Sequence, residues 1–122
     1  MVNVDEIAAQ ALANSERLTN LLYNKKCSIY HDNAPEDGNY PIVQYTDVAE
    51  NPVSHADNNP VGVQKVIRVT VINNTPVGRQ ELKDAVIEAM RNAGFMWQLT
   101  DTVRDGREYY TIIDFSYGFL MS

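Results

Sequence analysis

The last third of the chain carries two hydrophobic periods side by side, and this constrains the fold more than any other feature. Between residues 79 and 93 six apolar residues recur at helical spacing, namely Leu82, Ala85, Val86, Ala89, Met90 and Ala93. Gly94 follows as a stop. Residues 95–103 and 108–121 then have the alternation of strands, and Asp105-Gly106 between them is a common hairpin signal.

The rest of the chain supplies one more helix and three more strands. An apolar stripe at helical spacing predicts a helix from about residue 5 to residue 22. Strands are predicted for residues 27–30, 40–46 and 63–72. We therefore expect one α+β domain over residues 1–122, with a mainly antiparallel sheet of four or five strands and two helices packed on it.

Two long polar segments, 31–39 and 47–62, are predicted to be loops because they are rich in proline, glycine and Asx residues. Loops this long are uncommon in compact domains and are usually functional or flexible. His31 and His55 lie in them beside acidic residues, so one alternative is a small ligand-binding or enzymatic module that uses both loops as a cleft. The acidic stretch from Asp32 does not match EF-hand spacing.

The final strand is apolar on both faces. Four aromatic residues share one face and are predicted to lie in the core beneath the helices: Tyr109, Phe115, Tyr117 and Phe119. Tyr110 and Ile112 lie on the opposite face, where either a covering loop or a partner protein must bury them. Tyrosine is enriched at interfaces, so partner contact is the favoured alternative.

Composition excludes several functional classes. The formal net charge of -6 and a pI near 4.7 argue against a nucleic-acid-binding surface. A single cysteine, Cys27, excludes an internal disulfide framework, and we expect it to be a small buried residue. No signal peptide or membrane span is expected. Since no nucleophile–base pair, ligand cluster or phosphate loop is recognisable, we predict that the protein is not an enzyme and needs no metal or cofactor.

At this point the chain resembles the small tail-terminator and tail-completion (head–tail joining) proteins of long-tailed bacteriophages and prophages. The resemblance covers most of the chain and follows the order and residue types of its elements. It rests on the N-terminal helix and on four further segments: Ala34-Pro35 through Tyr45, Lys65 to Val71, Leu82 to Phe95, and Tyr109 to Tyr117.

The resemblance implies a structural virion protein that forms a ring, commonly hexameric, at the head-proximal end of the tail tube. Such a ring contacts the tube protein and the head connector, and DNA passes through its lumen without specific binding. Its expected location is the virion tail, and the host cytoplasm during assembly. A neck or head-completion protein of the same virion is an alternative. From the residues themselves we expect a partner interface that includes Glu36, Asp37, Tyr40, Tyr110 and Ile112.

Overall fold

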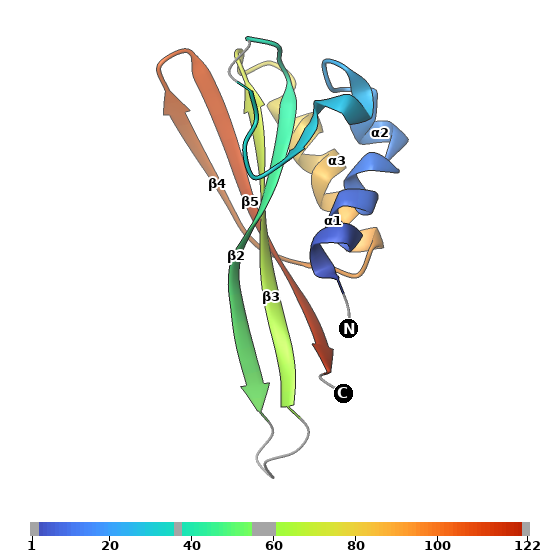
Figure 1. The fold of residues 1–122 in the computed structure, drawn as a ribbon. Coiled ribbons are helices and arrows are strands. Elements are labelled where there is room, and N and C mark those ends of the chain that lie inside the picture. The colour runs from blue at the N-terminus through green and yellow to red at the C-terminus, as the bar shows by residue number, and fades with distance from the viewer. Residues whose placement is uncertain (1–2, 36–37, 55–60, 121–122) are drawn as a thin grey trace.

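The structure, a computed structural model, is a five-stranded sheet with helices on one face (Figure 1). It describes residues 3–35, 38–54 and 61–120. In chain order the elements are α1 (Val4–Ala13), α2 (Glu16–Thr19), the 3-10 helix η1 (Lys25–Ser28), β1 (Ile29–His31), β2 (Ile42–Ser54), β3 (Val61–Asn73), α3 (Arg79–Asn92), β4 (Met96–Asp105) and β5 (Glu108–Leu120).

The strands lie in the order β1-β2-β3-β5-β4. β1 runs parallel to β2, and every other neighbouring pair is antiparallel. The α+β class and the mainly antiparallel sheet predicted from the sequence are therefore confirmed. α1 lies over β1, β2 and β3, whereas α3 lies over β3, β5 and β4, so the two longer helices divide the sheet between them.

The core lies between the helices and the face of the sheet that carries the odd-numbered residues of β3 and β5. Ile67, Val69, Ile113 and Phe115 are fully buried there against the apolar stripes of the helices. Tyr117 packs on the edge of this core, where its ring contacts that of Phe95 and lies over Gly94. Burial of large apolar side chains on this one face provides most of the stability of the fold.

Helix α3 begins and ends close to the predicted residues. Gly78 precedes it at a φ of 83°, and Gly94 follows it at a φ of 98°, a conformation that L side chains rarely adopt. The Gly94 amide donates to the carbonyl of Arg91, and the Phe95 amide donates to that of Met90. These bonds satisfy carbonyls at the helix end and turn the chain directly into β4.

The predicted helix over residues 5–22 is wrong in its length. α1 ends at Ala13, and a separate short helix begins at Glu16. Ser15 caps this second helix, because its Oγ accepts a hydrogen bond from the amide of Leu18 at 3.2 Å. Serine and asparagine side chains compete for backbone hydrogen bonds, which favours a break at Asn14-Ser15. The apolar stripe in the sequence continues across this break because Leu18, like Ala8 and Leu12 of α1, is fully buried.

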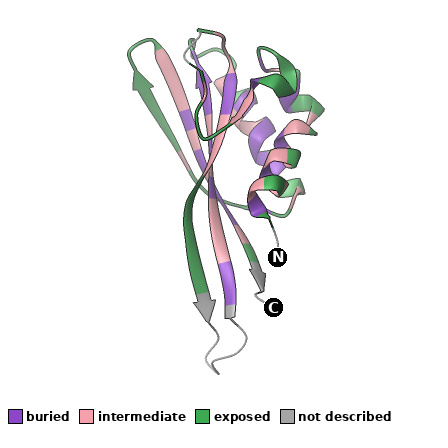
Figure 2. Cartoon of the chain, viewed as in Figure 1, coloured by how far each residue is buried: buried purple, intermediate pink, exposed green. Residues whose placement is uncertain are grey.

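The predicted loop 47–62 is also wrong. β2 continues to Ser54 and β3 begins at Val61, so most of this segment is a β-hairpin that extends beyond the helices (Figure 1). Residues 47–52 of β2 are all exposed (Figure 2), and a strand with no buried face has no alternation to detect. Pro52 is tolerated because β2 is an edge strand at this point. It pairs with β3 on one side and, among the described residues, with no strand on the other.

The other predicted loop, 31–39, begins one residue later than expected, since His31 is the last residue of β1. Glu36, Asp37 and His55 lie outside the described residues. Cys27 is exposed in η1 rather than buried, which corrects the expectation from composition.

Candidate assembly surfaces

The face of the sheet opposite the helices is covered at one end by residues 32–35 and 38–41. The amide of Ala34 donates to Gln44 Oε1 at 3.1 Å, and Gln44 lies on this face. Tyr40 and Tyr110 meet at one carboxylate: the Tyr40 hydroxyl donates to Glu108 Oε2 and the Tyr110 hydroxyl to Glu108 Oε1 at 3.0 Å. A covering segment thus accounts for the half-buried state of Tyr110, and its contact with a partner stays a prediction.

Ile112 lies further along the same face and is also half-buried. The pairing register places it between Thr70 of β3 and Asp101 of β4. On β4 three large apolar side chains are more exposed, with exposed fractions of 64% for Met96, 59% for Leu99 and 44% for Val103. Sequence reasoning missed these three residues, although a strand that places large apolar side chains on the face away from the helices is itself a signal for an interaction surface.

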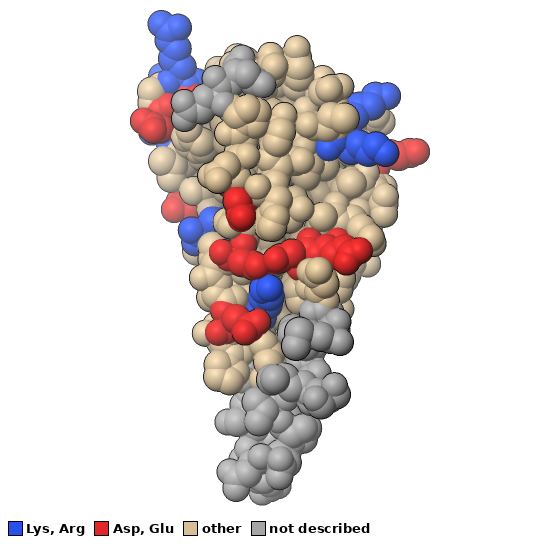
Figure 3. Space-filling view, viewed as in Figure 1, with Lys and Arg blue, Asp and Glu red and all other residues tan. Residues whose placement is uncertain are grey.

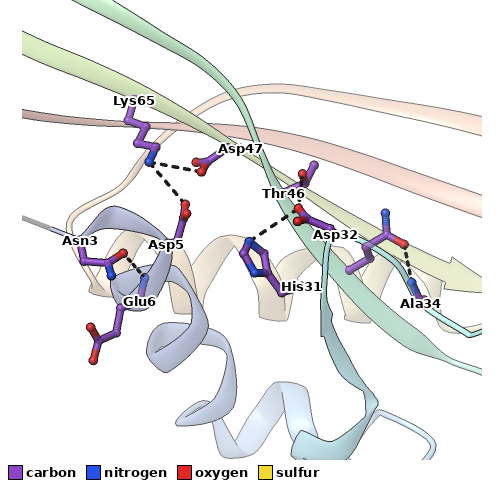
Figure 4. A network of polar contacts seen from close by, with 10 residues as sticks. Asn3, Asp5, Glu6, His31, Asp32, Ala34, Thr46, Asp47 and Lys65 are labelled. Atoms are coloured by element: carbon purple, nitrogen blue, oxygen red, sulfur yellow. Dashed lines mark hydrogen bonds and ion pairs between the residues drawn. The ribbon is translucent and has the colours of Figure 1, made fainter.

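On the helical face, a polar network joins the start of α1 to the β2–β3 hairpin (Figure 4). Lys65 Nζ lies 3.2 Å from Asp47 Oδ2 and 3.7 Å from Asp5 Oδ1. The second distance is too long for a hydrogen bond, and Asp5 Oδ1 is buried without a hydrogen-bond partner in the described part of the chain. Burial raises the pKa of Asp5, and the neighbouring Asp47 carboxylate raises it further.

Neighbouring carboxylates also raise the pKa of Lys65. Burial lowers the pKa of Lys65, but its hydrogen bond to Asp47 and the negative charges of Asp47, Asp5 and Glu50 together raise it above its ordinary value. Lys65 therefore stays charged and is surrounded by an excess of acid. Asp5, Glu6, Asp47 and Glu50 form what we term the acidic band, and Figure 3 shows acidic side chains gathered across the middle of this face.

The histidine predicted as a candidate ligand has a structural role in the fold. His31 stacks on Tyr45 with ring centroids 4.8 Å apart and lies 3.6 Å from Asp32 Oδ1. Asp32 in turn accepts a hydrogen bond from the Thr46 hydroxyl at 2.7 Å (Figure 4). Across residues 3–35, 38–54 and 61–120, no group of three or more His, Cys, Asp or Glu residues could hold a metal ion.

A pocket of about 460 Å³ lies between α3 and the start of β4, near the edge of the sheet that is far from the acidic band. Trp97 forms one wall with 47% of its surface exposed, and its indole N–H is fixed by a 2.8 Å hydrogen bond to Thr100 Oγ1. Lys83, Ile87 and Arg91 line the other wall at four-residue spacing on α3. We term this the Trp97 pocket.

The Trp97 pocket is lined by three cations, Arg17, Lys83 and Arg91, and by two acids, Asp84 and Glu88, so its lining has a net positive charge in an acidic protein. Arg17 at its rim is paired with Glu88 at 3.2 Å, but within the described residues no ion pair joins Lys83 or Arg91. Among the described residues, neither of these two cations therefore forms an ion pair, and Asp84 of the same lining instead accepts a hydrogen bond from Gln80. The exposed aromatic ring and the two cations together have the chemistry of a site for an acidic partner segment.

No protein-family model matches the chain, and no curated protein matches it. Among solved structures, the fold is similar to a chain of the virion of a native gene transfer agent (GTA) particle. The TM-score is 0.61 at 16% sequence identity, and the match covers 89% of this chain and 88% of that chain. At this identity the likeness establishes the fold alone. In the described residues, no helix is long and apolar enough to cross a membrane.

Proposed function

We propose that this protein is a structural component of a phage-like virion with a long tail. In this proposal it caps the head-proximal end of the tail tube as a ring and joins the tube to the head connector. The observation that carries the proposal is the similarity in fold, over almost the whole of both chains, to a chain of a gene transfer agent virion. The resemblance of the sequence to tail-terminator and tail-completion proteins is an independent argument for the same role.

The surfaces support a ring subunit. Rings require heterologous contacts, in which two different surfaces of each subunit meet. The acidic band and the Trp97 pocket are two such surfaces, and they lie toward opposite edges of the sheet. A net charge of -6 suits a subunit whose lumen passes DNA, because cationic side chains would bind phosphates and retard the passage.

The tube and connector contacts require further surface. The apolar strip of Met96, Leu99 and Val103 is 44–64% exposed and faces away from the helices, and the half-buried Ile112 lies beside it. We assign this strip, together with Tyr40, Tyr110 and the segment that contains Glu36 and Asp37, to contacts with other virion proteins. No catalytic step or cofactor is part of the proposed role.

Deletion of the gene from its phage or prophage tests the proposal, with particles examined by electron microscopy. Overlong tails are the expected result if the ring stops tube growth, and normal-length tails without heads are expected if its main role is joining. Complementation with the intact gene should restore complete particles. Normal virions after deletion would overturn the proposal.

A further inference from the structure

The sheet places the acidic band and the Trp97 pocket at one level. Asp47 on β2 pairs with Ile67 on β3, Ile67 pairs with Phe115 on β5, and Phe115 pairs with Trp97 on β4. Asp47 and Trp97 therefore stand at the two ends of a single cross-strand row. All four side chains of the row lie on the helical face of the sheet, because Ile67 and Phe115 are in the core there.

At this level both lateral edges of the sheet lack a partner strand in the described chain. β1 pairs with β2 only as far as Tyr45, so the edge of β2 is free from Asp47 onward. β4 forms the other edge, and all of it but Thr100 is exposed. Two copies set side by side at one height thus bring the β2 edge of one copy against the start of β4 in the next.

From this arrangement we infer that the Trp97 pocket binds the acidic band of a second copy of this chain. The inference rests on the proposed function in taking the neighbour to be a like subunit of a ring. Lys83 and Arg91, which no described carboxylate pairs, face Asp47 and Glu50 of the neighbour. Val48 next to Asp47 is 41% exposed and supplies an apolar contact for Trp97.

The contact is heterologous, since the two surfaces differ and lie on opposite sides of the subunit. After two copies bind, one of them keeps a free pocket and the other keeps a free band. Such an interface cannot stop at a dimer, and it closes only when the rotation between neighbours completes a circle. Complementary charge also selects this pairing, because band against band or pocket against pocket brings like charges together.

Charge exchange tests the inference on the purified full-length chain. The pocket variant carries Lys83→Glu and Arg91→Glu, and the band variant carries Val48→Lys and Glu50→Lys. We expect wild-type chain to self-associate at high concentration and low salt in analytical ultracentrifugation. Each variant alone should lose this association by roughly tenfold or more in dissociation constant, as expected when central interface residues are replaced.

An equimolar mixture of the two variants is the decisive sample. The glutamates of one variant then face the lysines of the other, and the unaltered pocket and band face each other at the next contact. Association should return in the mixture, and also in a single chain that carries all four substitutions. The matched control, Lys25→Glu with Lys26→Glu in the exposed η1, makes the same change in net charge as the pocket variant and should associate more strongly than that variant.

Three results would overturn the inference: a wild-type chain that stays monomeric up to its solubility limit, a folded pocket variant that still associates like the wild type, or a mixture that fails to recover. Circular dichroism of each variant establishes that it is folded. These measurements are independent of the virion experiment. Normal particles after gene deletion would remove the tail role and leave this interface standing, whereas failure of charge exchange would remove the interface and leave the tail role standing.

Discussion

Arg68 and Asp114 face each other across β3 and β5 and form a two-pronged ion pair on the face of the sheet away from the helices. Arg68 Nε lies 2.9 Å from Asp114 Oδ1, and a terminal nitrogen lies 3.2 Å from Oδ2. The hydrogen bond to Asp114 raises the pKa of Arg68. The Asp114 side chain is only 15% exposed, so the pair lies in a sheltered part of an otherwise open surface.

Replacement of Arg68 by alanine should lower the free energy of unfolding by about 1–2 kcal/mol, because Asp114 would remain shielded from water without its donors. The Arg68 side chain is itself 43% exposed, which keeps the effect at this modest level. Chemical denaturation of R68A, of Asp114→Asn and of the double variant measures the coupling. Arg17→Ala, which breaks the exposed pair with Glu88, is the control and should cost at most about 1 kcal/mol.

Ile113 and Phe115 flank Asp114 on β5 and are fully buried on the helical face. Alanine at either position should destabilise the fold by about 2–5 kcal/mol through lost burial and the cavity that remains. Thermal and denaturant unfolding of the two variants measures this cost. Leu99→Ala on β4 is a matched control, since its side chain is 59% exposed and its loss should cost far less. Equal losses for Phe115→Ala and Leu99→Ala would contradict the buried position of β5.

Asp5 gives a pH dependence of known sign. Its pKa is raised above the ordinary value of 3.8 by burial and by Asp47, so above pH 3.8 the folded chain holds this proton more tightly than the unfolded chain. Ionisation of Asp5 therefore removes stability as the pH rises from 3.8 through its folded-state pKa, and that stability returns as the pH falls. Relative to Asp5→Asn, the wild type should become less stable across this interval.

Thermal melts of both chains from pH 3 to pH 7 give the comparison. Glu6→Gln is the control for loss of a negative charge near the N-terminus of α1, since Glu6 is the next residue of the same turn and is exposed. If the wild type instead became more stable relative to Asp5→Asn as the pH rises, the assigned direction would be wrong. The attraction between Asp5 and Lys65 would then outweigh the effect of burial.

Ionic strength should act on association more than on folding. Contacts between Lys83 or Arg91 and the acidic band of a neighbour are made at a surface, where salt screens charge over about 8–10 Å at 0.10–0.15 M. Sedimentation of the wild type between low and moderate salt should show weaker association, while the melting temperature of the monomer changes little. Association that strengthens steadily with salt would instead indicate an interface dominated by the apolar strip of β4.

The parts of the fold predicted correctly from the sequence are those where burial imposes a period. α3 and β5 lie against the core on one side, so their apolar residues follow helical and alternating spacing, and both elements were found within a residue or two. Gly94 and Asp105-Gly106 mark turns whose conformation is set locally. Sequence could not separate α1 from α2, because Leu18 extends the stripe of α1 across the cap at Ser15.

The candidate surfaces were predicted less well, for a related reason. Residues 47–52 of β2 have no buried face, and their sequence resembles a loop until β3 is seen beside them. Trp97 and Asp47 are fifty positions apart, and only the strand register places them in one row. Tyr110 was correctly assigned to the face away from the helices, but its link to Tyr40 through Glu108 depends on where Tyr40 lies over the sheet.

The two halves of β2 differ in what determines the identity of their residues. Val43 is fixed by the chain's own core, whereas residues 47–52 touch little of it and can change at small cost to folding. A molecule outside the chain can therefore set the identity of those residues. Related chains could acquire a new neighbour by altering this hairpin while the sheet and α3 stay as they are, which is one way for a fold to persist when only 16% of residues are shared.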